Sequence, residues 1–444
     1  MATSFIRSIL DTPLDGTIKG IPIATGSVRL GDVGAMGWNA LRGDMVLPLL
    51  VLHDSHLRNN LELIRDFAAQ NQVSIAPHGK SSLCPQLYLQ HVEMGGAWGM
   101  SAATTQQAAV IAASGIGNIL IVNQIVGRAA VAQLAEIIGA YPDCAICSLV
   151  DSAASLEELR RFGAALLRKG ERFRVLIEIG VPGGRAGVRR FEDAVRLIDL
   201  ITSQRDVFDL VGVECYEGAA SGSTPEETIR EVDRLLDLTV DVLLHARSAG
   251  AFGDRTEIIL TAAGSTYPDR AVARLRRAGN IAGLRIVLRG GSSLISDHGV
   301  YRTQLELMDK RGGLDVGPAP RSAVAAFKPA LELLAAVLSV QEDDVAILNM
   351  GIRDMPHDQG YPVPLRLYRD GALIRTIDEG DGSWRIARSH DQHCFLAHPR
   401  GADVAVGDVV AFGISHPCTA FDKWRVLYRV DEEFNVTGAL KTFF

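Results

Sequence analysis

The sequence predicts an α/β fold, in which an eight-stranded β/α barrel of the TIM type is followed by a C-terminal β domain. Three observations predict this fold. Eight short apolar runs follow one another along the chain, and each leads into a helix-like stretch. After about residue 325 the pattern changes to short alternating runs with turn signals. Finally, 444 residues are too many for one small core.

The eight apolar runs are mostly continuous rather than alternating, which is typical of parallel strands that helices cover on both faces. They span residues 73–77, 97–101, 118–123, 145–151, 174–180, 210–216, 257–263 and 284–289. Among the helical stretches, residues 152–169 begin with Ser152 in a capping position, and residues 225–247 repeat the pattern at greater length. A doubly wound open sheet is the alternative, and it is disfavoured because no GxGxxG motif follows a strand.

The chain on either side of the barrel has its own pattern. Residues 47–52 form one more strand-like run, and a helical stretch follows at residues 55–69. Beyond the barrel, a helical stretch at 328–338 leads into strand-like runs at 345–349, 365–368, 409–414 and 426–430. We therefore expect three parts: residues 1–55, which join the β domain, a barrel at 56–320, and the β domain at 321–444.

Composition and charge narrow the class of protein. With a formal net charge of −7 and a pI near 5.9, the chain has no basic field for nucleic acid. No apolar run approaches the roughly 18 residues of a membrane helix, and the N-terminus has no signal-peptide pattern, so we expect a cytoplasmic protein with no membrane partner. The six cysteines are too sparse for a disulfide scaffold, and we expect Cys144 and Cys147 to be buried thiols rather than metal ligands.

Lys80 stands just past the first predicted barrel strand, in the segment Ala76-Pro77-His78-Gly79-Lys80-Ser81. In this fold the carboxyl ends of the strands build the active site. The chain has only seven lysines against 38 arginines, so a lysine at a strand end is less expected as routine surface charge. A lysine that forms a Schiff base must keep a reactive amine in a protected place, which makes Lys80 the candidate. An exposed loop lysine is the alternative.

Two glycine turns follow the last two predicted barrel strands. Strand seven runs into Gly264-Ser265-Thr266, and strand eight into Gly290-Gly291-Ser292. Backbone N–H groups and hydroxyls at such turns bind phosphate, and TIM barrels commonly place a phosphate site after strands seven and eight. Each turn alone is more often an ordinary turn, but the two together favour a phosphate site.

Two arginines also stand at predicted strand ends. Arg185 lies in a glycine-rich loop after the fifth strand, and Arg289 ends the eighth. A guanidinium at either position can bind an anionic cofactor oxygen or a substrate carboxylate. The alternative for each is a solvated loop arginine.

His416-Pro417-Cys418 is the sharpest motif of the C-terminal region. Residues two apart on an extended segment point the same way, so the imidazole and the thiolate can bind one ion, and this ligand pair favours zinc. Two ligands are too few, so water, substrate or the nearby His390, His393 and Cys394 must complete the shell. A buried cysteine beside a capping histidine is the alternative.

Several of these motifs occur in the order seen in one group of enzymes. They are Pro77-His78-Gly79-Lys80, the glutamate-to-arginine stretch that ends at Arg185 and Gly187, Tyr216-Glu217-Gly218, Gly264-Ser265-Thr266, Leu288-Arg289-Gly290-Gly291 with Asp297, Asp391-Gln392-His393, and His416-Pro417-Cys418. Over about residues 45–440 the chain resembles the D-threonine aldolase and D-serine dehydratase group of alanine-racemase-like (fold type III) pyridoxal 5′-phosphate (PLP) enzymes. Residues 419–424 resemble the bacterial D-serine deaminase-like branch in particular.

The resemblance implies a PLP-binding barrel with a C-terminal β domain, and a homodimer whose active sites lie near the subunit interface. Lys80 matches the lysine that holds the cofactor and then removes the Cα proton of the substrate. His416 and Cys418 match the metal pair. The other cofactor contacts implied are His78, Arg185, Tyr216, Gly264, Ser265, Thr266, Arg289, Gly291 and Ser292.

The resemblance also bears on the reaction. A His-x-Cys pair is similar to the arrangement in the zinc dehydratases, whereas the aldolases typically show His-x-Asp. The aldolases usually have a histidine directly after Tyr-x-Gly, where this chain has Ala219. Because retro-aldol cleavage must remove the β-hydroxyl proton, the loss of that base argues against it.

We therefore expect a PLP- and zinc-dependent enzyme that eliminates the β-hydroxyl of a D-3-hydroxy amino acid, such as D-serine, to give a keto acid and ammonia. The enzymatic alternative is an aldolase that cleaves D-threonine-like substrates to glycine and an aldehyde. A PLP-binding carrier without turnover and a metal-free racemase are further alternatives, and neither needs the Lewis acid that the His-x-Cys pair suggests.

Overall fold

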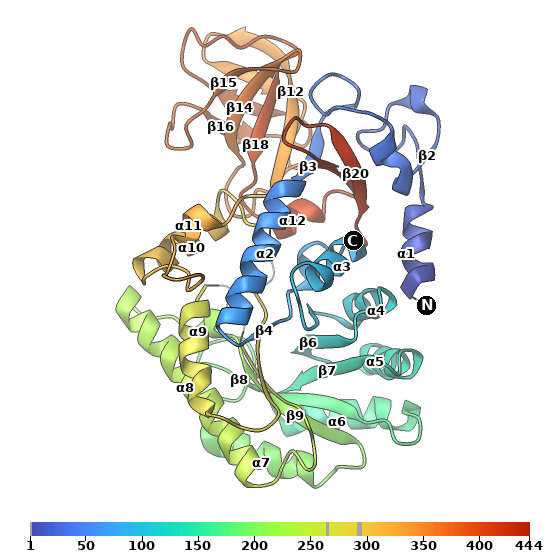
Figure 1. Ribbon diagram of the computed structural model, residues 1–444, viewed down its shortest axis with the longest axis vertical. Helices are drawn as coiled ribbons and strands as arrows, with labels where there is room; N and C mark the ends of the chain where they lie inside the picture. The colour runs from blue at the N-terminus through green and yellow to red at the C-terminus, as the bar shows by residue number, and fades with distance from the viewer. Residues whose placement is uncertain (1, 263–265, 291–294) are drawn as a thin grey trace.

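Eight parallel strands form the barrel in the computed structural model, which describes residues 2–262, 266–290 and 295–444 (Figure 1). Their order in the sheet is β4-β11-β10-β9-β8-β7-β6-β5. Backbone hydrogen bonds from Trp98 to Ile75 and from Ser101 to Pro77 close the ring between β5 and β4. The strands are β4 (Ser74–Ile75), β5 (Met100–Ala102), β6 (Asn118–Gln124), β7 (Ala145–Val150), β8 (Phe173–Ile179), β9 (Phe208–Cys215), β10 (Ile258–Ala262) and β11 (Leu284–Leu288). Each overlaps one of the eight predicted runs, so the predicted barrel is confirmed.

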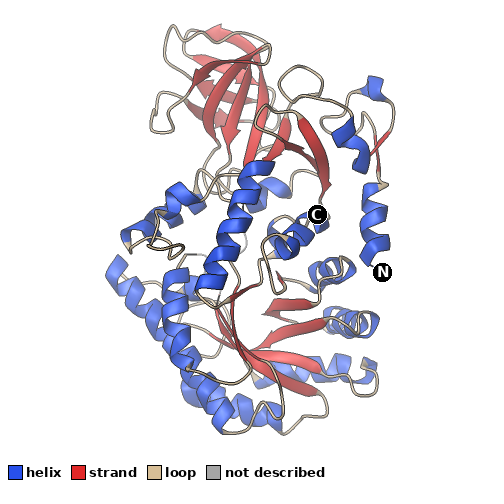
Figure 2. Cartoon of the chain, viewed as in Figure 1, coloured by secondary structure: helices blue, strands red, loops and turns tan. Residues whose placement is uncertain are grey.

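Helices surround the barrel, whereas the C-terminal domain is built almost entirely of strands (Figure 2). The helices from the start of the barrel onwards are α2 (Asp54–Gln70), α3 (Pro85–Glu93), α4 (Thr105–Ala113), α5 (Arg128–Ala140), α6 (Ala153–Gly163), α7 (Phe191–Thr202), α8 (Pro225–Ser248), α9 (Pro268–Leu275), α10 (Val300–Lys310) and α11 (Ala323–Ala326). Ser152 caps α6 as predicted, because its hydroxyl accepts a hydrogen bond from the Ser155 N–H at 3.2 Å. Side chains such as Leu120, Leu176 and Val211 pack together inside the barrel.

The N-terminal strand completes the β domain, as predicted. Strand β3 (Leu49–His53) pairs antiparallel with β12 and parallel with β19. Before it, α1 (Ala2–Leu10), β1 (Pro13–Leu14) and β2 (Val28–Arg29) contribute side chains to a core shared with this sheet. The remaining elements are β12 (Leu331–Glu342), β13 (Val345–Leu348), β14 (Val363–Arg369), β15 (Ala372–Thr376), β16 (Arg385–Ser389), β17 (Cys394–Ala397), β18 (Val409–Gly413), α12 (Pro417–Phe421), β19 (Val426–Val430) and β20 (Val436–Lys441).

The helix predicted at residues 328–338 is wrong, because this segment begins the long central strand β12. Apart from Glu332, the run Leu331-Glu332-Leu333-Leu334-Ala335-Ala336-Val337 is apolar and has no clear period, and such a run does not distinguish a buried helix from a strand covered on both faces. The neighbours decide: β12 pairs with β3, β18 and β13, and its first five residues are buried. The sheet therefore overrides the local pattern.

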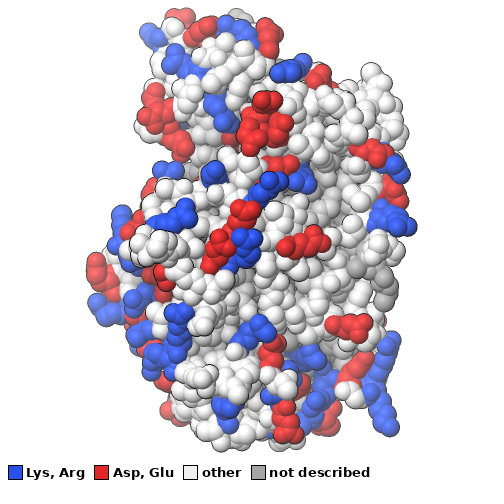
Figure 3. Space-filling model, in the orientation of Figure 1, with Lys and Arg blue, Asp and Glu red and all other residues white. Residues whose placement is uncertain are grey.

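On the face shown in Figure 3, acidic and basic side chains are interspersed rather than gathered by sign. Across the described ranges of the chain, no helix is both long and apolar enough to cross a membrane.

A buried ion network joins β3 to the sheet. His53 Nε2 lies 3.2 Å from the carboxylate of Glu332 on β12, and Arg366 on β14 pairs with the same carboxylate. Burial disfavours the charged form of Glu332, but the hydrogen bond and charge of His53 and the charge of Arg366 outweigh it and lower the pKa of Glu332 to about 2. The ionised carboxylate therefore stabilises the junction between the N-terminal strand and the β domain.

Glu332→Gln is expected to lower the free energy of unfolding at pH 7 by about 3 kcal/mol, because His53 and Arg366 lose their buried partner. The folded-state pKa of Glu332 lies below the unfolded value of about 4.3, so its contribution is present above that pH and is lost as the pH falls from about 4 toward 2. Urea unfolding at pH 7 and between pH 4.5 and 2.5 measures both effects. Glu342→Gln, at the exposed end of the same strand, is the control, and equal losses in the two variants contradict the assignment.

Candidate active site

A cavity of about 280 Å³ lies between the carboxyl ends of the barrel strands and the start of α12. The side chains that line it are His78, Lys80, Ser81, Ala103, Val122, Asn123, Glu178, Arg185, Glu214, Tyr216, Thr266, Arg289, Tyr301, Gln304, His416 and Cys418. All the predicted site residues that the structure describes are among them. The predicted phosphate-turn residues Gly264, Ser265, Gly291 and Ser292 lie outside the described residues.

Lys80 belongs to a short 3₁₀ turn, Gly79–Ser81, that directly follows β4. The Tyr88 hydroxyl donates a hydrogen bond to the Gly79 carbonyl at 2.9 Å, and a side chain at Gly79 would press against the same tyrosine. This packing holds the turn in place at the mouth of the barrel. Within the part of the chain that the structure describes, the Lys80 ammonium has no hydrogen-bond or ion-pair partner, so its amine is available to the cavity.

Two buried nitrogens at the cavity also lack partners among the described residues: Nδ1 of His78 and Nε of Arg289. Burial, together with the charges of Lys80, Arg289 and Arg185, lowers the pKa of His78 well below its ordinary value, so its ring is neutral. Buried polar atoms are usually hydrogen-bonded, and orphaned ones beside a cavity point to a polar ligand. The donor set therefore fits a small anionic group with several acceptor oxygens or nitrogens.

Arg289 lies at the end of β11 with only 2% of its side chain exposed. Its Nη2 lies 2.7 Å from the Glu214 carboxylate and donates to the Cys215 carbonyl at 3.0 Å, while Nη1 donates to the Thr261 hydroxyl at 2.7 Å. Burial raises the pKa of Glu214 to about 7, more than the guanidinium lowers it. The pair thus places a rigid cation in the floor of the cavity.

Arg185 reaches the cavity from the loop between β8 and α7, and its guanidinium carbon lies 4.5 Å from the centre of the Tyr216 ring. This stacking orients both side chains. Neighbouring Glu178 accepts a hydrogen bond from Gln124 at 2.5 Å, and burial raises the pKa of Glu178.

His416 is the N-cap residue of α12. Its hydrogen bonds with Cys418 and Asp358 raise the pKa of His416 to about 9. Cys418 Sγ lies 3.5 Å from Ser81 Oγ, so the pair sits beside the Lys80 turn. Nδ1 of His416 lies 2.7 Å from the carboxylate of Asp358, which leaves Nε2 as the nitrogen able to bind an ion. The two residues therefore fit part of a zinc shell.

The structure does not support His390, His393 or Cys394 as further ligands of this metal shell. His390 and His393 are exposed, and Cys394 is fully buried in β17. None of the three lines the cavity, and no group of three or more His, Cys, Asp or Glu side chains in the described ranges could hold a metal ion. The reason is their place in the β16–β17 hairpin, whose turn points to solvent. If His416 and Cys418 hold a metal ion, water or substrate would fill its remaining positions.

The sequence reasoning missed Glu178, Glu214 and Asp358. A signal was present for the first two, since each is a carboxylate near the carboxyl end of a mostly apolar strand. Asp358 carried no such signal, because its partner His416 is 58 residues further along the chain.

Comparison with known proteins bears on what the cavity holds. The family model for the N-terminal domain of alanine racemase matches residues 52–258, and the serine dehydratase domain model matches residues 330–430. A D-threonine aldolase from Arthrobacter sp. is 28% identical over 349 residues, which are 76% of this chain and 80% of that protein. The chain belongs to the alanine-racemase-like (fold type III) family of PLP enzymes. Within that family it falls in the branch of D-threonine aldolases and D-serine dehydratase-like proteins.

Solved structures of fold type III proteins share the fold of this chain. D-threonine aldolase from Filomicrobium marinum superposes with a TM-score of 0.69 at 23% identity, over 90% of this chain and 95% of that one. D-threo-3-hydroxyaspartate dehydratase from Delftia sp. HT23 gives 0.64 at 19% identity, over 89% and 97%. Two variants of that dehydratase replace a histidine or the cysteine two positions later with alanine, and the cysteine variant is in the metal-free form. The family implies PLP as cofactor.

Proposed function

We propose that this chain is a PLP- and divalent-metal-dependent lyase that removes the β-hydroxyl of a D-3-hydroxy amino acid and releases a keto acid and ammonia. One observation carries the proposal. The Lys80 turn and the His416/Cys418 pair line the same cavity, although 337 residues separate Ser81 from Cys418. A lysine that can hold PLP thus stands beside a pair that can hold a Lewis acid.

When bound, PLP stabilises negative charge at Cα of the substrate. Lys80 would hold the cofactor and then take the Cα proton, for which its unpaired amine is available. Thr266, together with the predicted turn residues Gly264, Ser265, Gly291 and Ser292 that lie outside the described residues, is our candidate for the phosphate site. Arg185, Tyr216 and His78 would contact the cofactor, and Arg289 is our candidate for the group that faces the ring nitrogen.

His416 and Cys418 would hold the metal, which we propose is zinc. The ion would polarise the β-hydroxyl and make it a better leaving group. Asp358 supports this role because it engages Nδ1 of His416, so that Nε2 would bind the ion in place of its proton. The dehydratase variants with a replaced histidine or cysteine, two positions apart like His416 and Cys418, lend further support.

A D-threonine aldolase-type reaction is the second candidate, because the Arthrobacter relative carries that activity in its name. Elimination is preferred because Ala219 leaves no histidine directly after Tyr216-Glu217-Gly218 to remove the β-hydroxyl proton. We also propose a homodimer, as the resemblance implies, which light scattering of the purified protein would test.

Purified protein incubated with D-serine is expected to release pyruvate and ammonia, and a chelator should abolish both. Cys418→Ser should lower zinc from about one ion per chain to below about 0.1. The control Cys144→Ser replaces a thiol that hydrogen-bonds the Ile116 carbonyl far from the cavity, so both zinc and activity should persist. The assay combines coupled keto-acid detection with metal analysis.

A parallel incubation with D-threonine distinguishes the alternatives. Glycine and acetaldehyde from D-threonine, without keto acid or ammonia from D-serine or D-threonine, would replace elimination by the aldolase reaction. An unchanged cofactor spectrum with no product from either substrate would indicate a PLP carrier.

A further inference from the structure

The loop that brings Arg185 to the cavity forms neither a helix nor a strand. It covers residues 180–190, between β8 and α7, and contains four glycines. Gly183 and Gly187 have φ angles of +73° and +96°, in the region that favours glycine. A glycine-rich loop loses much conformational entropy when it adopts one shape, so its position depends on contacts that hold it.

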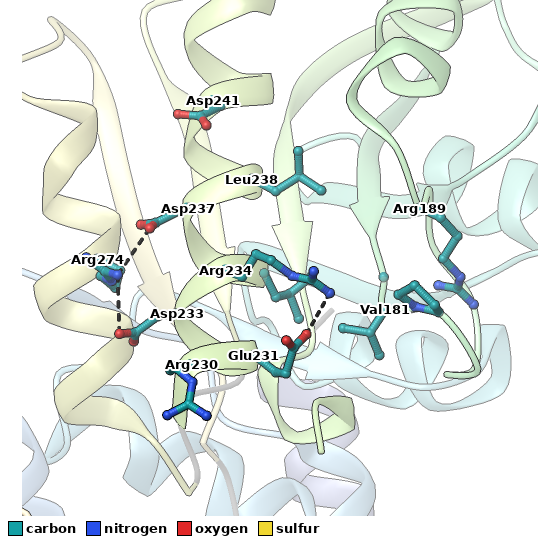
Figure 4. Close-up of a pocket in the computed structure, with 13 residues that line it drawn as sticks. Val181, Arg189, Arg230, Glu231, Asp233, Arg234, Asp237, Leu238, Asp241 and Arg274 are labelled. Atoms are coloured by element: carbon teal, nitrogen blue, oxygen red, sulfur yellow. Dashed lines mark ion pairs between the residues drawn. The ribbon is translucent and has the colours of Figure 1, made fainter. Parts of the chain in front are cut away.

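A cavity of about 610 Å³ separates the outer face of the loop from helix α8. Figure 4 shows Val181 and Arg189 on the loop side of this cavity, and Arg234 and Leu238 on the helix side. Part of the outer face of the loop is therefore unpacked, although Val188 is buried in the barrel core, and hydrogen bonds must help to hold its shape.

Backbone hydrogen bonds between Gly180, Val188 and Glu178 tie the two ends of the loop, and the Gly187 N–H donates to Asp151 at 3.0 Å. Arg189 adds contacts at the centre of the loop. Its Nη1 donates to the Ala186 carbonyl at 2.5 Å, and its Nη2 donates to the carbonyls of Gly184 at 3.1 Å and Arg185 at 3.2 Å. A Cβ atom at Gly180 would overlap this guanidinium, so the group lies directly against the end of β8. One planar cation thus ties three consecutive carbonyls to the strand.

We propose that Arg189 is a positioning residue that holds the backbone of residues 184–186 and thereby sets Arg185 in the active-site cavity. The inference rests on the proposed function, in which Arg185 binds an anionic oxygen of the cofactor or substrate. Arg189 lines the outer cavity and not the active-site cavity, so it acts through the loop. A lysine at this position keeps the charge but cannot donate to three carbonyls in the same plane.

The test compares Arg189→Ala, Arg189→Lys, Arg185→Ala and the double alanine variant in the full chain. Arg190→Ala is the matched control, because Arg190 is exposed and pairs with Asp193 at 2.8 Å instead of touching the loop carbonyls. The Kd for PLP and the KM for D-serine are measured for each.

Arg185→Ala should raise the Kd for PLP or the KM for D-serine. The same constant should rise about 10-fold in Arg189→Ala, less in Arg189→Lys, and not at all in Arg190→Ala. The double variant should be no worse than Arg185→Ala alone, because Arg189 acts through Arg185. Additive losses in the double variant, or equal losses in Arg189→Ala and Arg190→Ala, overturn the inference.

Hydrogen exchange of the loop amides separates this inference from the proposed function. Residues 181–188 should exchange faster in Arg189→Ala than in the wild type or Arg190→Ala, whether or not PLP is present. Unchanged exchange overturns the bracing role. Faster exchange in a protein whose wild type fails to bind PLP would overturn the proposed function and leave the bracing role standing.

Discussion

Lys80→Ala is expected to remove the visible absorption band of lysine-bound PLP and to lower turnover by at least about 10³-fold. Both effects follow from the loss of the Lys80 Nζ atom. The Lys80 amine lines the cavity without a partner among the described residues, so no neighbouring group there shares its role. The prediction is the most direct test of the assignment, since the absorption spectrum reports the cofactor bond independently of the substrate.

The matched control is Lys169→Ala, which removes an exposed lysine before β8, at the opposite end of the barrel strand from the cavity. This variant should keep the wild-type spectrum and turnover. Absorption spectra of both purified variants, with D-serine turnover measured in parallel, provide the comparison. Persistence of the band in Lys80→Ala would mean that another lysine holds the cofactor.

Arg289→Leu is expected to lower the free energy of unfolding by about 3–5 kcal/mol at neutral pH. The substitution leaves the Glu214 carboxylate buried, with 1% of its side chain exposed and without its 2.7 Å partner. It also removes donors to the Thr261 hydroxyl and the Cys215 carbonyl. The cost comes from burying Glu214 without its partner, as an uncompensated charge at high pH and as a protonated acid at lower pH, rather than from lost packing, since leucine retains the apolar part of the side chain.

The pH dependence of this loss has a definite sign. The pKa of Glu214 in the folded state, about 7, lies above the unfolded value of about 4.3, so folded Glu214 binds the proton more tightly and stability falls as pH rises through this range. Arg289 lowers that pKa, and its removal raises it further. The loss in Arg289→Leu should therefore be smaller at pH 5, where Glu214 is protonated, than at pH 9.

Urea unfolding of Arg289→Leu at pH 5, 7 and 9 measures this dependence. Arg285→Leu, on the same strand, is the control, because its pair with Glu257 is more than one-third exposed and should cost at most about 1 kcal/mol. Adding Glu214→Gln to Arg289→Leu should restore part of the stability at pH 9. A loss that is equal at all three pH values would show that the Glu214 charge is not its source.

The sequence by itself determined the architecture of the barrel. Continuous apolar runs that alternate with helices predict a parallel sheet covered on both faces, and eight such units without a GxGxxG motif favour the barrel over an open sheet. The same criterion failed at β12, because an apolar run without a period fits a helix and a strand equally well. Only pairing with β3, β18 and β13 decided its structure.

For the candidate site as well, the sequence predicted some of the residues and only the structure identified their partners. Local motifs and their order pointed to Lys80, Arg185 and the His416/Cys418 pair, because each motif lies within a few residues of the chain. The partners that give these residues their charge state and orientation come from other elements: Glu214 for Arg289, and Asp358 for His416. Arg189 is four residues from Arg185, yet its role depends on a turn that folds its guanidinium back onto the loop carbonyls. Residue types and order thus set the available chemistry, whereas burial and pairing across the fold decided how each group is held.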